Sequence, residues 1–202
     1  MWFRHNRILL GKILLLLVIL LLSGVSVFGC AQTGAQPRGW SGGTIANGTL
    51  FLGSMEGKLV AVNTSDDSRL WEVILETSKP AGGFGCAPAS TAVAIYGSPA
   101  VDGDLVYVGG YNGKIYAINS SSGALRWVYP REGDLQPIVG GPMLALGKVY
   151  IGCSDDKVYA LGAESGDKVA DFDLGSPVSS SPVLVDSSVI IATEEGKIYS
   201  LD

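Results

Sequence analysis

The chain has 202 residues, with 14 basic and 19 acidic side chains and a formal net charge of −5. Three of the basic residues and none of the acidic ones lie in the first 29, so the remainder is more strongly acidic. An acidic body argues against binding to nucleic acid or to anionic lipid surfaces, both of which select basic patches. The single histidine, His5, also lies in this N-terminal part. Histidine triads, histidine metal sites and haem attachment are therefore excluded from the rest of the chain.

Residues 1–29 are typical of a signal peptide. Basic residues precede the apolar run 13–22, and small residues follow it. The run is shorter than the roughly 20 residues that a membrane-spanning helix needs. Residues 27–30, Val-Phe-Gly-Cys, resemble a bacterial lipobox, although Phe28 stands where a small residue is usual. The resemblance implies lipidation of Cys30 and an extracytoplasmic, membrane-anchored location in the cell envelope. An uncleaved N-terminal anchor is the alternative.

One short pattern then occurs four times at a period near 40 residues. The copies are EGKLVAVN at 56–63, NGKIYAIN at 112–119, DDKVYALG at 155–162 and EGKIYSLD at 195–202. Self-similarity at this period is typical of stacked supersecondary units. We therefore assign 30–40 to a tether and 41–202 to the repeats.

Each repeat predicts strands throughout. Segments rich in β-branched and aromatic residues precede the turn (50–53, 106–109, 149–152 and 189–192), and further segments follow it (59–62, 115–118, 158–161 and 198–201). Gly57, Gly113 and Gly196 can supply the positive φ of such turns, and Asp156 can tolerate it. An outer strand carries Trp71 and Trp127 in the first two repeats. Four strands in about 40 residues predict an all-β fold, a β-propeller of four-stranded antiparallel blades, with about four blades as a partial or small propeller.

The repeat pattern resembles the PQQ-like, or quinoprotein-like, propeller family, best in residues 98–127. The resemblance implies that Trp71 and Trp127 dock between neighbouring blades, and that Ala170 at the third equivalent position gives a weaker junction. Quinoprotein dehydrogenases of this family hold pyrroloquinoline quinone and Ca²⁺ with adjacent cysteines and an acidic cluster. This sequence has neither, so we expect no cofactor, no metal and no catalytic residues.

Two local features are candidates for function. One lysine recurs beside each turn: Lys58, Lys114, Lys157 and Lys197. These lysines either form a charged ring that docks a partner or belong to solvated hairpin tips. The connection from Trp71 to Pro99 is long and contains Cys86. In alternating strands it emerges at the same end as the turn that begins near Cys153. We hypothesise that Cys86 and Cys153 pair there if their Cα atoms lie within about 7 Å, and two independent thiols are the alternative.

We expect a non-enzymatic scaffold for protein–protein interaction. Membrane-tethered members of the resembled family act in the outer-membrane β-barrel assembly machine, which implies envelope proteins as partners. The alternatives are a degenerate quinoprotein that binds a ligand and a fragment of a longer propeller. Because four blades are the lower limit for a closed ring, the chain either closes alone, forms a homodimer that completes a propeller, or is half of a longer product.

Overall fold

The computed structural model describes residues 39–75 and 93–201. They belong to one compact unit, Gln36–Asp202, and contain 15 strands. Within these two ranges there is no helix long and apolar enough to cross a membrane. Trp40, which the sequence assigned to the tether, forms a bridge with Ser54 and so joins the first repeat.

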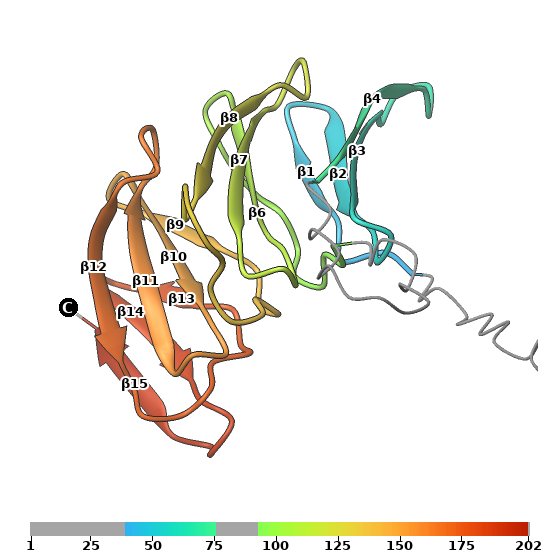
Figure 1. Cartoon of the computed structure of the whole chain (residues 1–202). Coiled ribbons are helices and arrows are strands. Elements are labelled where there is room, and N and C mark those ends of the chain that lie inside the picture. Colours follow the sequence, from blue (N-terminus) through green and yellow to red (C-terminus); the bar gives the residue numbers. More distant parts are fainter. Residues whose placement is uncertain (1–38, 76–92, 202) are drawn as a thin grey trace, which may run out of the picture. The chain divides into compact units, whose positions relative to one another are not determined.

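The strands form four antiparallel sheets in chain order (Figure 1). The first contains β1 (Thr44–Ala46), β2 (Thr49–Gly53), β3 (Lys58–Asn63) and β4 (Arg69–Ile74). The second contains β5 (Ala100–Asp102), β6 (Leu105–Gly109), β7 (Ile115–Asn119) and β8 (Leu125–Tyr129). The third contains β9 (Met143–Ala145), β10 (Lys148–Gly152), β11 (Lys157–Gly162) and β12 (Lys168–Asp173). The fourth has three described strands, β13 (Val183–Val185), β14 (Ser188–Ala192) and β15 (Ile198–Leu201).

The turn chemistry is the same in every sheet. The residues at the turn between the two central strands have positive φ, 77° at Gly57, 74° at Gly113, 72° at Asp156 and 80° at Gly196. The outer strand is also offset identically, because a register shift follows Ala61, Ala117 and Ala160 in their pairings. The predicted alternation of strand and turn is therefore confirmed, and each sheet is one four-stranded blade or, in the last case, the first three strands of one.

Consecutive sheets bury their facing sides against each other. Between the first and second sheets, Phe51, Leu59 and Ala61 pack with Val106, Val108 and Ile118. Between the second and third, Tyr107, Ile115 and Ala117 pack with Val149, Ile151 and Leu161. Between the third and fourth, Tyr150 and Ala160 pack with Val189 and Leu201. The core is thus a series of sheet junctions, which is the packing of a partial β-propeller.

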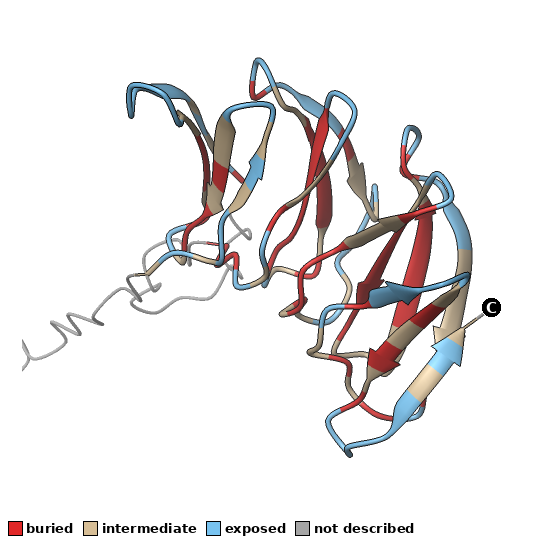
Figure 2. Cartoon of the chain, turned by 180° about the vertical axis from the view of Figure 1, so that it is seen from behind, coloured by how far each residue is buried: buried red, intermediate tan, exposed pale blue. Residues whose placement is uncertain are grey.

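The two end sheets each keep one exposed face. Burial is dense in the second and third sheets and much sparser at the outer sides of the first and fourth (Figure 2). Ile45 is 67% exposed on the first sheet, and Ile198 is 75% exposed on the fourth. Among the described residues, the outer sides of the first and fourth sheets are therefore uncovered, which is consistent with a partial propeller.

Candidate interaction face

One end of the sheets gathers the turns between central strands and the linkers that enter each sheet. We call it the turn-and-linker face, made of turns 54–57, 110–113, 153–156 and 193–196 and linkers 39–43, 93–99, 136–142 and 176–182. A backbone hydrogen bond joins turn to linker in each sheet. The amides of Met55, Tyr111, Ser154 and Glu194 donate to the carbonyls of Gly39, Ala94, Pro137 and Pro177. This repeated bond gives the turns fixed positions relative to the linkers.

The first two sheets place exposed aromatic side chains on this face, which we call the aromatic patch: Trp40 on the first sheet, and Tyr96 and Tyr111 on the second. Trp40 is 58% exposed, and Tyr111 is 50% exposed. Tyr96 and Tyr111 meet edge to face, with ring centroids 5.4 Å apart. Trp40 and Tyr96 stand at equivalent positions, three residues before Gly43 and Pro99. The equivalent positions in the third and fourth sheets carry Val139, Ser154, Ser179 and Glu194, so the patch is confined to one side.

A polar pocket adjoins the patch on the first sheet. It has a volume of about 400 Å³, and Trp40, Glu56, Lys58, Arg69 and Glu72 are among the residues that line it. Glu72 accepts from both cations, at 3.2 Å from Lys58 Nζ and 2.6 Å from Arg69 Nη1. A partner that docks beside Trp40 therefore meets an aromatic ring next to an ordered, charge-balanced cluster.

The recurring lysines are paired with acids of their own sheets or adjoining loops. Lys157 Nζ lies 3.0 Å from Asp171, Lys197 Nζ lies 2.8 Å from Glu195, and Lys114 Nζ lies 3.7 Å from Asp134. The hydrogen bond and charge of Lys157 lower the pKa of Asp171 from its ordinary value. These pairs satisfy the lysines within the chain and favour the interpretation that they stabilise solvated hairpin tips.

The two tryptophans cross the sheet junctions. Trp71 Nε1 donates to the carbonyl of Ser120 at 2.9 Å, and Trp127 Nε1 donates to the carbonyl of Ala163 at 2.7 Å. Both acceptors lie in the turn before the outer strand of the next sheet. Each indole therefore reaches from the outer strand of one sheet to the next sheet.

Cys153 lies inside the third sheet's core, with no measurable exposure. Its thiol donates to the carbonyl of Gln136 at 3.2 Å. Burial, as the main cause, raises the pKa of the thiol to about 12. Cys86 and Cys30 lie outside the described residues, so the disulfide and the lipidation remain predictions.

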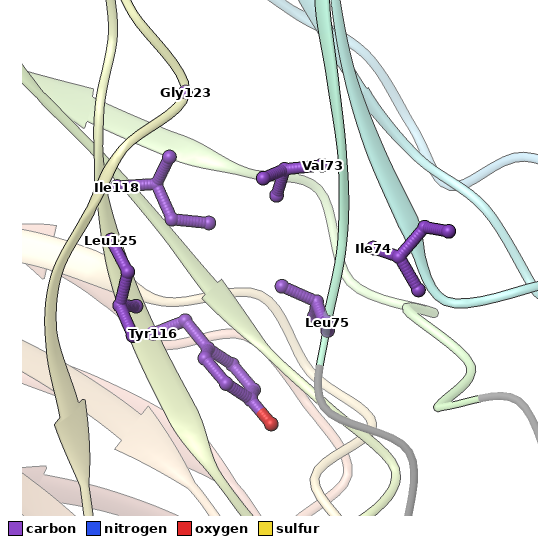
Figure 3. Close-up of a pocket in the computed structure, with 7 residues that line it drawn as sticks. All are labelled: Val73, Ile74, Leu75, Tyr116, Ile118, Gly123 and Leu125. Carbon is purple, nitrogen blue, oxygen red and sulfur yellow. The ribbon is translucent and has the colours of Figure 1, made fainter.

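A small apolar pocket of about 70 Å³ lies between the outer strand of the first sheet and the second sheet (Figure 3). Its lining includes Val73, Leu75, Tyr116, Ile118 and Leu125. The volume is well below the roughly 300 Å³ at which small-molecule sites begin. Among residues 39–75 and 93–201, no group of three or more histidine, cysteine or acidic side chains could hold a metal ion.

The sequence analysis missed the aromatic patch. Repeat alignment could have found its two linker positions, because Trp40 and Tyr96 fall in the same register. The exposure of the two aromatic side chains depends on the conformation of the linkers. The periodicity of the strands does not predict that conformation. The sequence pattern assigned no role to Tyr111.

Comparisons with known proteins agree with this fold. A sequence model of the family described as Outer membrane protein assembly factor BamB matches residues 30–202. The protein of that name from Shewanella oneidensis is 35% identical over 89 residues, which is 44% of this chain and 18% of the relative. The crystal structure of BamB from Moraxella catarrhalis aligns with a TM-score of 0.64 and 24% identity, covering 80% of this chain and 46% of that one. A computationally designed protein, Ika4, aligns with a TM-score of 0.62 and 14% identity, covering 81% of this chain and 92% of that one. The chain thus spans less than half the length of either BamB.

Proposed function

Since this chain belongs to the family described as Outer membrane protein assembly factor BamB, we propose that it is a non-catalytic docking scaffold of the cell envelope. Its partners are envelope proteins, and its process is the assembly of outer-membrane proteins. The relatives are described as assembly factors, which supports this assignment. The expected resemblance to the PQQ-like propeller family is confirmed.

The aromatic patch is the observation that carries the proposal. Half-exposed Trp and Tyr side chains are enriched among residues that dominate protein–protein binding. Trp40 and Tyr111 combine large exposed apolar area with polar edges, and Trp40 also lines a charged pocket. A hydrophobic centre with a polar rim is the usual anatomy of a docking site.

A lipid on Cys30 would hold the propeller at the membrane and limit its search to envelope proteins. The N-terminal sequence supports this part of the proposal. Replacement of Cys30 by alanine then moves the chain from the membrane fraction to the soluble fraction, and metabolic labelling with a radioactive fatty acid is lost. Labelling that persists in the variant would contradict the assignment.

No redox cofactor takes part in this function. A second copy of the chain is a further partner. The missing adjacent cysteines support the first point, and the two exposed end faces support the second.

The patch is tested by comparing two variants as baits for envelope proteins. Trp40→Ala combined with Tyr111→Ala removes the aromatic area. Leu146→Ala removes an exposed apolar side chain, 80% exposed, at the β9–β10 turn, which lies at the opposite end of the sheets. We expect the double variant to lose at least tenfold of each specific partner and the control to retain it. Equal capture by both variants would refute the patch as the docking site.

A further inference from the structure

The exposed faces of the two end sheets carry apolar side chains in the same register as buried ones. On the first sheet this side also carries Lys58 and Glu72, which pair with each other. Leu50, Leu52 and Val62 of the first sheet stand where the second sheet has Val106, Val108 and Ile118. In the second sheet this side packs against the first sheet. The corresponding side of the first sheet includes Ile45. Its side chains therefore match those of a side that packs against a preceding sheet.

The fourth sheet has the complementary side. Ile190 and Ile198 stand where the second sheet has Tyr107 and Ile115, and where the third has Tyr150 and Val158. Those equivalents all pack against the next sheet in the chain. On the fourth sheet, Val183 and Val185 are 53% and 52% exposed. Exposed apolar side chains that share one face of a sheet are typical of a contact with a partner.

We propose that the exposed face of the fourth sheet docks on the exposed face of the first sheet of a second copy. Two such contacts, related by a twofold axis, join two copies into one ring. The occupant of each face is identified by the chain itself, because the three internal junctions use this same pair of faces. The chain covers 46% of the Moraxella catarrhalis propeller chain, so two copies supply about as many sheets as that protein.

The linkers and the first strands of neighbouring sheets provide a template for the contact. Inside the chain, the amide of Gly141 donates to Ser181 Oγ at 2.8 Å across the third junction. Ala46 and Val101 lie in one cluster across the first junction. Their equivalents at the proposed contact are Val185 of one copy and Ile45 of the other. These two side chains are exposed in the single chain and become buried in the ring.

The proposed contact differs from the internal junctions at the outer strand, where the first sheet has Glu72 in the place of Val128 of the second, and at the turn before that strand. Gly123 and Gly166 lie under the indoles of Trp71 and Trp127, whereas the first sheet has Asp67, with φ 57°, at that turn position. An indole therefore does not stack there as it does inside the chain. The contact depends on the first strand and the two central strands of each sheet. We expect it to dissociate more readily than an internal junction.

Light scattering on residues 31–202, which contain the whole of the compact unit Gln36–Asp202, measures the mass directly. We expect a discrete species with twice the mass of the chain. A monomer at micromolar concentration, or a series of larger open-ended species, would overturn the proposal. The measurement uses no envelope partner, so its failure leaves the proposed docking function standing.

Two charge variants test which faces meet. Ile45→Lys and Val185→Asp each place a charge in both contacts of a homodimer, and each alone is expected to be monomeric. An equimolar mixture restores the dimer, because one contact pairs lysine with aspartate and the other keeps its native residues. Val169→Lys, at a 55% exposed position of β12, is the matched control and stays dimeric. A dimer that persists in either single variant, or a mixture that stays monomeric, would refute the assigned faces.

Discussion

Trp127 Nε1 donates a hydrogen bond to the carbonyl of Ala163 at 2.7 Å, from one sheet to the next. The indole also covers Gly166, where an added Cβ would lie 2.5 Å from Trp127 Cδ2. Trp71 repeats the arrangement over Gly123, with 3.0 Å at the equivalent point. The tryptophan of one repeat and the glycine of the following repeat therefore form one structural unit.

Replacement of Gly166 by alanine should destabilise the chain strongly. The residue has φ +70°, which costs an L-residue about 1–2 kcal/mol. The added methyl also displaces the indole, which adds about 1–3 kcal/mol of overpacking. Gly147→Ala is the matched control, because Gly147 has φ +69° and open space around it. Urea unfolding should show the larger loss at Gly166, and equal losses would contradict the tryptophan–glycine unit.

Removal of the Trp127 side chain should be more costly than removal of its hydrogen bond. Trp127→Ala leaves a cavity in the second junction and is expected to lower the free energy of unfolding by about 3–5 kcal/mol. Trp127→Phe keeps most of the packing and should cost about 1 kcal/mol for the lost hydrogen bond, because Tyr107 also donates to the Ala163 carbonyl. Equal losses in the two variants would show that packing is not the main contribution.

Cys153 should be inert in the folded chain. Its burial raises the pKa of the thiol to about 12, so the reactive thiolate is scarce at neutral pH. In a Cys86→Ser background, iodoacetamide should label Cys153 only after unfolding in urea. Rapid labelling of the native chain would mean that Cys153 is accessible, as the proposed disulfide with Cys86 requires.

The ion pairs of Asp171 should make stability depend on pH in the acid range. Hydrogen bonds from Lys157, first, and Lys168 lower the pKa of Asp171 from its ordinary 3.8. A carboxylate whose pKa is lowered by folding contributes stability above the ordinary pKa and loses it as pH falls through the lowered value. Asp171→Asn should therefore reduce stability at neutral pH and have a smaller effect below the ordinary pKa. Urea unfolding at neutral pH and below the ordinary pKa measures the loss of stability in Asp171→Asn. Glu132→Gln is the exposed control. A loss that does not depend on pH would contradict the role of the ion pairs.

The sequence predicted the sheets well because each repeat contains the residues that form its turns. Gly57 and Gly113 appear at the same spacing before strands of the same composition, and register follows from that spacing. The tryptophan contacts were also predictable, since Trp71 and Trp127 recur at one distance from those turns.

The position of Cys153 was harder to infer. The sequence placed it at the end of a strand on the turn-and-linker face, and its side chain instead points into the core. Ser54 and Thr193, at the equivalent positions, are also buried, with 4% and 6% exposure. Burial at this point arises because the linker covers the strand end, a contact that strand alternation alone does not encode.

Site-specific photo-crosslinking in the envelope of a diderm bacterium tests the central claim, that the aromatic patch docks envelope proteins. A photoreactive amino acid replaces Tyr111 in one experiment and Leu146, at the opposite end of the sheets, in another. We predict discrete crosslinked envelope proteins from position 111 and few or none from position 146. Crosslinks from position 146 alone, or none from position 111, would contradict the account.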